Sequence, residues 1–188
     1  MTNNIGAQKT IVKFNKEKVH VYLPPPSGTV RTTKQILASL RYGKEVNHSI
    51  PVTKALNLPD KKLPIKPYVL GAWLGDGHKH SGALTGIDPE IWEEIEKEGY
   101  HVTHGLKDKQ HHNVTGLSTI LKANNLYCNK HIPVEYLRSS ESQRLALLQG
   151  LMDTDGTVSD SGSAEFCNTN KQIIDGVYDL ICSLGWKG

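Results

Sequence analysis

The sequence of 188 residues has few of the features that mark secreted, membrane or zinc-ribbon proteins. It contains only three cysteines, Cys128, Cys167 and Cys182, and no CxxC pair. This argues against a disulfide framework or a zinc ribbon and favours a reducing, cytoplasmic setting. No apolar run approaches the ~20 residues of a membrane span, and the N-terminal residues lack the apolar core of a signal peptide. A length of this size predicts one globular domain, or one domain with an appendage.

Acidic residues are scarce in the first third of the chain. Residues 1–66 contain twelve Lys or Arg against three acidic residues, a net charge of +9. Residues 67–188 hold the other ten basic and sixteen acidic residues, a net charge of −6. A basic segment joined to an acidic body indicates a polyanion partner for the first part. The alternative is a basic surface that is simply solvated.

Two local patterns predict the structure of the basic segment. Alternating apolar residues over 9–23 predict a β-hairpin. A proline-rich linker follows, and the next apolar stripe predicts a helix over 33–42, capped by Thr32 or Thr33 and ended by Gly43.

From residue 63 onward, strand pairs alternate with helices, which predicts an α+β fold. Prolines suited to a first helical turn and glycines suited to a C-cap mark the helix ends. The predicted helices cover 67–77, 88–99, 117–126, 140–156 and 171–186, and the predicted strands lie within 78–86, 100–107, 111–116, 156–162 and 164–170.

An internal repeat relates two of these helices. The stretch "VLGAWLGDG" (69–77) aligns without a gap with "LQGLMDTDG" (148–156), 79 residues later. Asp76 then corresponds to Asp155, whereas Asp153 is matched by a leucine. A duplicated site would therefore use Asp76 and Asp155, and we expect Asp153 to cap locally or to contact the sister helix.

Small residues occupy matching places in both copies. Gly71 and Gly75 lie four residues apart on one helix, and Gly150 and Thr154 take the same places on the other. Small residues at this spacing remove bulk from one helix stripe, so two backbones can approach closely. Helices packed in this way and running in the same direction would bring their C-terminal carboxylates side by side.

Two carboxylates that close repel each other unless a cation lies between them. The negative helix ends and the last-turn carbonyls add to this preference. Oxygen ligands without imidazole or thiolate favour Mg²⁺, with Mn²⁺ as the alternative. Asp76 and Asp155 are therefore the candidate metal ligands. The competing interpretation is that both Asp-Gly pairs are ordinary helix-ending turns.

The two nonapeptides resemble the paired motifs of the LAGLIDADG homing endonucleases. The stretches at 63–78, 129–133 ("NKHIP") and 142–156 are similar to blocks of the dodecapeptide-type endonuclease found inside inteins. The resemblance implies a metal-dependent hydrolase that cuts a specific double-stranded DNA site. It implies two pseudo-symmetric αββαββα halves, each sheet forming half of a saddle in the DNA major groove.

The resemblance also implies roles for individual residues. The metal-binding, catalytic acids of the family correspond to Asp76 and Asp155, and its metal-proximal lysine corresponds to Lys130. An exposed loop lysine without a catalytic role is the alternative for Lys130. Further DNA contacts are expected from basic side chains outside the paired helices: Arg31, Lys34, Arg41, Lys107 and Lys109.

The resemblance divides the chain into a basic region (1–62), a first half (63–139) and an incomplete second half (140–188). Region 1–62 would contact DNA or be a remnant of a splicing domain. Only 32 residues follow Gly156, enough for one hairpin and one helix. The chain starts with Met1 and ends in "GWKG", so we do not expect it to splice alone. A non-cleaving DNA-binding remnant and an intein fragment remain alternatives. Two motif copies predict a monomer, with a partner chain only if the second half is completed in trans.

Overall fold

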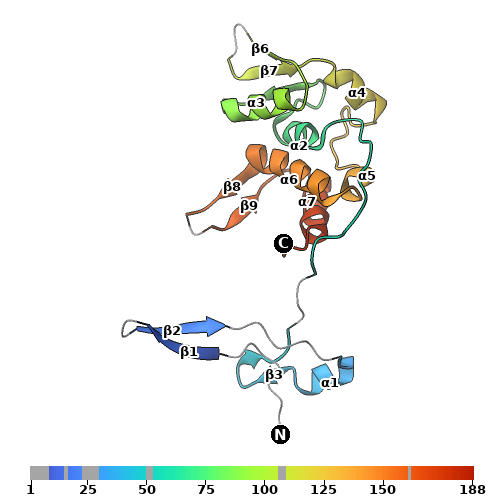
Figure 1. The fold of residues 1–188 in the computed structure, drawn as a ribbon. Helices are drawn as coiled ribbons and strands as arrows, with labels where there is room; N and C mark the ends of the chain where they lie inside the picture. Colours follow the sequence, from blue (N-terminus) through green and yellow to red (C-terminus); the bar gives the residue numbers. More distant parts are fainter. Residues whose placement is uncertain (1–8, 15–16, 23–29, 50–52, 106–108, 161) are drawn as a thin grey trace. The chain divides into compact units, whose positions relative to one another are not determined.

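A computed structural model describes residues 9–14, 17–22, 30–49, 53–105, 109–160 and 162–188 (Figure 1). The chain forms two compact units, Met1–Pro51 and Val52–Gly188. The division expected from the sequence, after residue 62, falls inside the second unit. None of the helices in the described ranges has the length and apolar character needed to cross a bilayer.

The first unit begins with the predicted hairpin. Strands β1 (Lys9–Phe14) and β2 (Glu17–Tyr22) pair antiparallel. Helix α1 (Thr33–Ala38) follows, and Thr32 is its N-cap. The Thr32 side chain accepts a hydrogen bond from the Gln35 amide while the Gln35 side chain accepts one from the Thr32 amide, a capping box.

The predicted extent of this helix was wrong at its C-terminal end. The helix ends at Ala38, and a short hairpin of β3 (Arg41–Tyr42) and β4 (Glu45–Val46) takes the place of its last turn. Gly43 has a positive φ of 62° and supplies the turn between the two strands rather than a helix C-cap. Arg41 therefore lies on a strand.

The second unit contains the two predicted motif helices and the other predicted elements (Figure 1). One short helix, α5, lies where the sequence suggested only a connector. In chain order the elements are α2 (Pro67–Asp76), β5 (Ala83–Thr85), α3 (Pro89–Lys97), β6 (Val102–His104), β7 (His111–Val114), α4 (Leu117–Ala123), α5 (Val134–Leu137), α6 (Glu141–Asp155), β8 (Gly156–Val158), β9 (Ala164–Phe166) and α7 (Lys171–Ser183).

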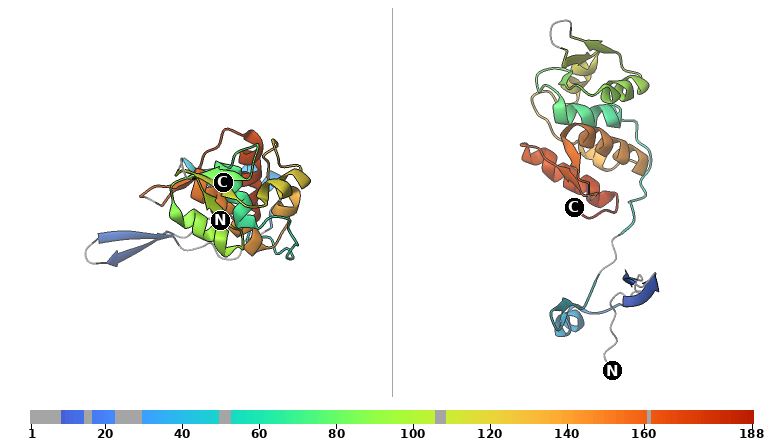
Figure 2. Two further views of the ribbon diagram at one scale, coloured as in Figure 1. Left: turned by 90° about the horizontal axis from the view of Figure 1, so that it is seen from above. Right: turned by 90° about the vertical axis from the view of Figure 1, so that its left-hand side faces the viewer.

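Helices α2 and α6 form the centre of this unit. In the right-hand view of Figure 2 they lie between α3 with its sheet on one side and α7 on the other. Helix α2 is buried from Pro67 through Leu74, as expected for a helix that is apolar on all sides. Ser140 caps α6 and forms a capping box with Gln143.

A three-stranded antiparallel sheet of order β5-β7-β6 follows α2. The Gly82 carbonyl accepts a hydrogen bond from Val114 of β7, and the next carbonyl, Ala83, accepts one from His78. Successive carbonyls point to opposite edges of a strand, so residues 77–78 lie on the other edge of β5. The αββαββα pattern implies a further strand between α2 and β5. In the structure, a single bridge between Gly77 and Leu84 takes its place.

The sheet has one buried and one exposed face. Leu84, His112 and Val114 point into the core, and Trp92 of α3 stacks on the His112 ring at 3.9 Å between centroids. Alternation places Thr85, His111, Asn113 and Thr103 on the opposite face. That face is polar and mostly open to solvent.

Two histidines share a hydrogen bond at the buried face. Nδ1 of His104 lies 2.6 Å from Nδ1 of His112, and Nε2 of His112 lies 3.2 Å from the Gly86 carbonyl. Burial lowers the pKa of His112 below its ordinary value, and the neighbouring His104 acts in the same direction.

This lowered pKa predicts a loss of stability in acid. Above the ordinary imidazole pKa of about 6.5, His112 is unprotonated in both the folded and the unfolded chain. Below that pH, His112 binds more protons in the unfolded chain than in the folded chain. We expect the free energy of unfolding to fall between about pH 7 and pH 5. Urea denaturation across this range should show a shallower fall for His112→Gln. Equal slopes for variant and wild type would contradict this assignment.

The second half of the repeat contains fewer strands. Among the described residues, strands β8 and β9 pair only with each other, and α7 packs its Ile173, Val177 and Leu180 side into the core. The described residues supply no third strand beside β9. This order of helix, hairpin and helix agrees with the elements expected after the second motif.

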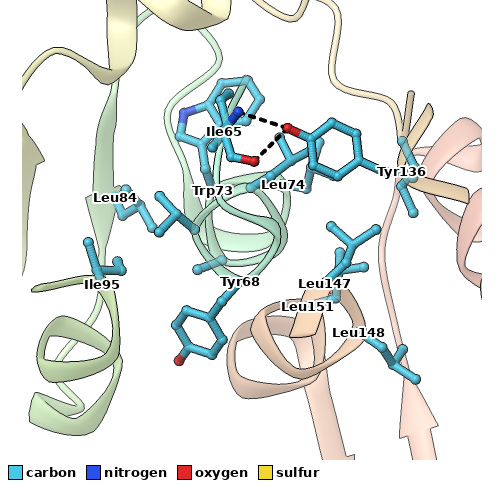
Figure 3. Packing of buried hydrophobic residues seen from close by; sticks show 14 of the residues in the cluster. Ile65, Tyr68, Trp73, Leu74, Leu84, Ile95, Tyr136, Leu147, Leu148 and Leu151 are labelled. Carbon is cyan, nitrogen blue, oxygen red and sulfur yellow. Dashed lines mark hydrogen bonds between the residues drawn. The ribbon is translucent and has the colours of Figure 1, made fainter. Parts of the chain in front are cut away.

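Buried polar groups bind the segment 53–66 to the rest of the second unit. In Figure 3 the Tyr136 hydroxyl lies between the backbone N–H and C=O of Ile65, at 3.0 and 2.8 Å. Arg144, fully buried, donates to the carbonyls of Leu56, Ser139 and Ser183. The bonds to Ile65 and Leu56 anchor the segment on α5 and α6, which explains why the compact unit starts before residue 63.

Candidate active site at the paired helix ends

Helices α2 and α6 touch backbone to backbone. A Cβ atom built on Gly71 would lie 2.3 Å from the Leu147 carbonyl oxygen, and one built on Gly150 would lie 2.2 Å from the Tyr68 carbonyl oxygen. Distances this short are forbidden for a methyl group, so each helix needs glycine at its crossing point. Both residues are buried.

The contact continues in the same direction along both helices. One turn after the crossing, a Cβ on Gly75 would lie 2.1 Å from Oγ1 of Thr154. The Thr154 hydroxyl bonds back to its own helix, at 3.0 Å from the carbonyls of Gly150 and Leu151. The helices therefore run parallel, and their C-terminal ends lie next to each other.

Asp76 and Asp155 end these two helices, and both are half-buried. Burial raises the pKa of Asp76, the negative charge of Asp155 raises it further, and Lys130 lowers it. The two carboxylates are therefore close enough to repel each other. The structure brings together the pair that the repeat singled out.

Lys130 comes from the loop before α5 and reaches the end of α2. Its Nζ donates to the carbonyls of Leu74 and Gly75, both at 3.0 Å, and lies 5.1 Å from the centre of the Trp73 ring. Burial lowers the pKa of Lys130 to about 8, while the charges of Asp155 and Asp76 act against that shift. This lysine is thus partly buried beside both carboxylates, and is not a free loop residue.

Two asparagines that were not predicted from the sequence complete the site. Asn168 donates from Nδ2 to a carboxylate oxygen of Asp155. Asn170 donates from Nδ2 to the Lys130 carbonyl at 2.8 Å. Both line a cleft of about 300 Å³ beside Lys130 and the end of α2. They follow strand β9, and only the tertiary fold brings them to the helix ends.

Asp153 lies apart from this cluster. Tyr68 on the sister helix donates to Oδ2 of Asp153 at 2.8 Å. Burial raises the pKa of Tyr68, and the hydrogen bond to Asp153 adds to the rise. The expectation that Asp153 contacts the sister helix is confirmed.

This bond predicts a modest stability effect. Tyr68→Phe should lower the free energy of unfolding by about 1 kcal/mol, because one hydrogen bond is lost without a change in shape. Urea denaturation measures the difference, with Tyr178→Phe, an exposed position on α7, as the matched control. A loss at Tyr178 as large as that at Tyr68 would contradict this interpretation.

The donor set fits a hard divalent cation. Among the described residues, no group of three or more His, Cys, Asp or Glu side chains could hold a metal ion. Mg²⁺ is commonly bound by one or two carboxylates, with water and substrate oxygens completing its shell. Asp76 and Asp155 match this pattern, and their mutual repulsion is what a cation between them would relieve.

The basic residues expected to contact DNA are exposed wherever the structure describes them. Arg31, Lys34 and Arg41 are exposed in the first unit, and Lys109 is exposed beside β7. Lys107 lies outside the described residues.

Comparison with known proteins gives two matches. Residues 142–188 match the model of the LAGLIDADG-like domain. Over 161 residues the chain is 43% identical to a protein of Mycobacterium intracellulare named replicative DNA helicase DnaB. The aligned region is 84% of this chain but 26% of that relative, so the chain spans about a quarter of the relative it matches. The part of the second motif helix that carries Asp155 lies inside the matched region, and the chain contains a LAGLIDADG-like domain over residues 142–188.

Proposed function

We propose that this protein is a site-specific homing endonuclease of intein origin that hydrolyses one phosphodiester in each strand of a DNA duplex. The observation that carries the proposal is the glycine-mediated contact of α2 and α6, which brings Asp76 and Asp155 together beside Lys130. Two carboxylates and a lysine that lie together are suited to the hydrolysis of a phosphodiester bond in a polyanion.

Each side chain has a distinct part in this proposal. Asp76 and Asp155 offer carboxylate oxygens to Mg²⁺ or Mn²⁺, and Asn168 holds Asp155 in orientation. When bound, such a cation supplies a nucleophilic water near neutral pH and neutralises charge on the leaving oxygen. Lys130, anchored on the last carbonyls of α2, stabilises the negative charge that develops on the phosphate.

DNA recognition would use the polar face of the first sheet. Thr85, His111, Asn113 and Thr103 present donors and acceptors on adjacent strands, as a β-ribbon in the major groove requires. Exposed Arg31, Lys34, Arg41 and Lys109 would add phosphate contacts, which give salt-dependent affinity rather than sequence choice. Lys107 is proposed for the same role from its place in the sequence.

The partial match to a helicase suggests the DNA to test. If the chain derives from an insertion in a helicase gene, its target is the helicase coding sequence from which the insertion is absent. Incubation of the full chain with that duplex should give Mg²⁺-dependent double-strand cutting that EDTA abolishes. Failure to cut this duplex or a randomised duplex library, under conditions where the chain is folded, would refute the proposal.

A second candidate function is DNA binding without cleavage. It is favoured by the two-stranded β8-β9 hairpin, which provides less sheet for the second half of a DNA saddle than the first half has. This candidate predicts salt-sensitive duplex binding with no cutting in Mg²⁺ or Mn²⁺. A fragment of a splicing element would instead regain activity only with its missing parts supplied.

A further inference from the structure

The loop that carries Lys130 also holds a cysteine in contact with a histidine. Sγ of Cys128 lies 2.9 Å from Nδ1 of His80, a residue 48 positions earlier in the chain. The His80 ring meets the Tyr127 ring edge-on, at 6.2 Å between centroids, which orients the imidazole. Neither residue belongs to the site formed by the paired helix ends.

The chain provides its own comparison for this thiol. All three cysteines are exposed. In the part of the chain that the structure describes, Cys167 and Cys182 have no imidazole within hydrogen-bond distance. Cys128 is therefore the one of the three with a base placed to take its proton.

The segments around Cys128 bring basic and neutral side chains to the thiol. The segments 77–82 and 117–131, which meet here, contain no Asp or Glu. Both supply lysines, and Nζ of Lys122 lies 4.7 Å from the centre of the Tyr127 ring. Exposed cysteines near cationic or imidazole groups are those that react as nucleophiles.

The same loop connects the thiol to Lys130. The Cys128 amide donates to the Lys79 carbonyl at 2.7 Å, which joins the loop to the segment after α2. Two residues later, Lys130 donates to the last carbonyls of α2. A group bound to Cys128 would replace the contact of Sγ with His80 on the short loop that also positions Lys130.

We propose that Cys128 and His80 form a reactive thiol pair whose modification by a low-molecular-weight disulfide displaces Lys130 and stops DNA cleavage. His80 takes the thiol proton, and the thiolate attacks one sulfur of the disulfide. The new S–S bond forms as the old one breaks, and the departing thiolate takes the proton from the imidazolium. The effect on cleavage rests on the proposed endonuclease function, whereas the reactivity of Cys128 does not.

The reactivity is tested first, on the folded full chain without DNA. The chain is treated at pH 7 with oxidised glutathione, and the three cysteines are followed by peptide mass spectrometry. Cys128 should react about tenfold faster than Cys167 or Cys182. His80→Asn should remove this advantage, and His131→Asn, a loop histidine that bonds the Asn129 carbonyl instead, should keep it. Equal rates at the three cysteines, or an unchanged rate in His80→Asn, would overturn the proposal.

The link to Lys130 is tested next, by a readout that needs no nuclease activity. Amide hydrogen exchange over 126–131 should rise in the Cys128 adduct and stay unchanged in treated Cys128→Ser. Cutting of the target duplex should fall at least about tenfold in the treated wild type but not in treated Cys128→Ser. An adduct that leaves both exchange and cutting unaltered would overturn the switch. Absence of cutting before treatment would count against the endonuclease proposal instead, with the exchange result still deciding the loop movement.

Discussion

Asp155→Asn should reduce Mg²⁺-dependent DNA cleavage at least about a thousandfold, and Asp76→Asn should do the same. Each substitution removes one of the two carboxylates that would hold the cation, and an amide oxygen carries no charge to replace it. Duplex binding at low salt should persist in both variants, because phosphate contacts by the basic side chains are unchanged. Gel-based cleavage and binding assays on the same duplex measure the two properties separately.

The matched control is Asp153→Asn, two residues from Asp155 on the same helix. Asp153 bonds Tyr68 and lies apart from the carboxylate pair, so its substitution should leave cleavage within about threefold of the wild type. Asp76→Asn should not weaken the fold, since the raised pKa of Asp76 means that its charged form is disfavoured there. Equal loss of cleavage in Asp153→Asn and Asp155→Asn would show that the repeat does not single out the catalytic residue.

Gly150→Ala should lower the free energy of unfolding by about 3 kcal/mol, although alanine favours an isolated helix. The added methyl group would lie 2.2 Å from the Tyr68 carbonyl oxygen, which is backbone and cannot turn away. Helices α2 and α6 would have to separate, and the core residues Leu147 and Leu151 would lose contacts with α2. Urea denaturation monitored by circular dichroism measures this change.

Gln149→Ala is the control for Gly150→Ala because it adds no atoms and lies on the exposed side of the same helix. Its effect should stay within about 0.5 kcal/mol. Gly71→Ala should repeat the loss, since its methyl group would meet the Leu147 carbonyl. A Gly150→Ala protein as stable as the wild type would mean that the helix crossing is looser than the structure has it.

Much of the fold could be predicted because its signals are local. Pro67 and Gly77 frame α2, the Ser140 box starts α6, and the apolar stripe of Ile91, Trp92 and Ile95 marks the buried side of α3. The errors also have local causes. A glycine with positive φ can end a helix or join two strands. Gly43 joins two strands, because Arg41 pairs with Val46.

The site was predictable only where the chain repeats itself or resembles a known family. The duplication pointed to Asp76 and Asp155, and the resemblance pointed to Lys130. The groups that hold these residues come from distant segments with no repeat of their own, such as Asn168 after β9 and Asn170 before α7. The contact of Cys128 with His80 joins two loops and has no periodic signal, so it emerges only from the folded structure.

Binding of Mn²⁺ tests most directly whether the paired helix ends form a divalent cation site. Electron paramagnetic resonance of Mn²⁺ titrated into the folded chain with its duplex reports bound and free ion. We predict that the wild type and Asp153→Asn bind the ion, and that Asp76→Asn and Asp155→Asn each weaken binding at least about tenfold. Equal Mn²⁺ binding by all four proteins would contradict the assignment of these two carboxylates as the metal site.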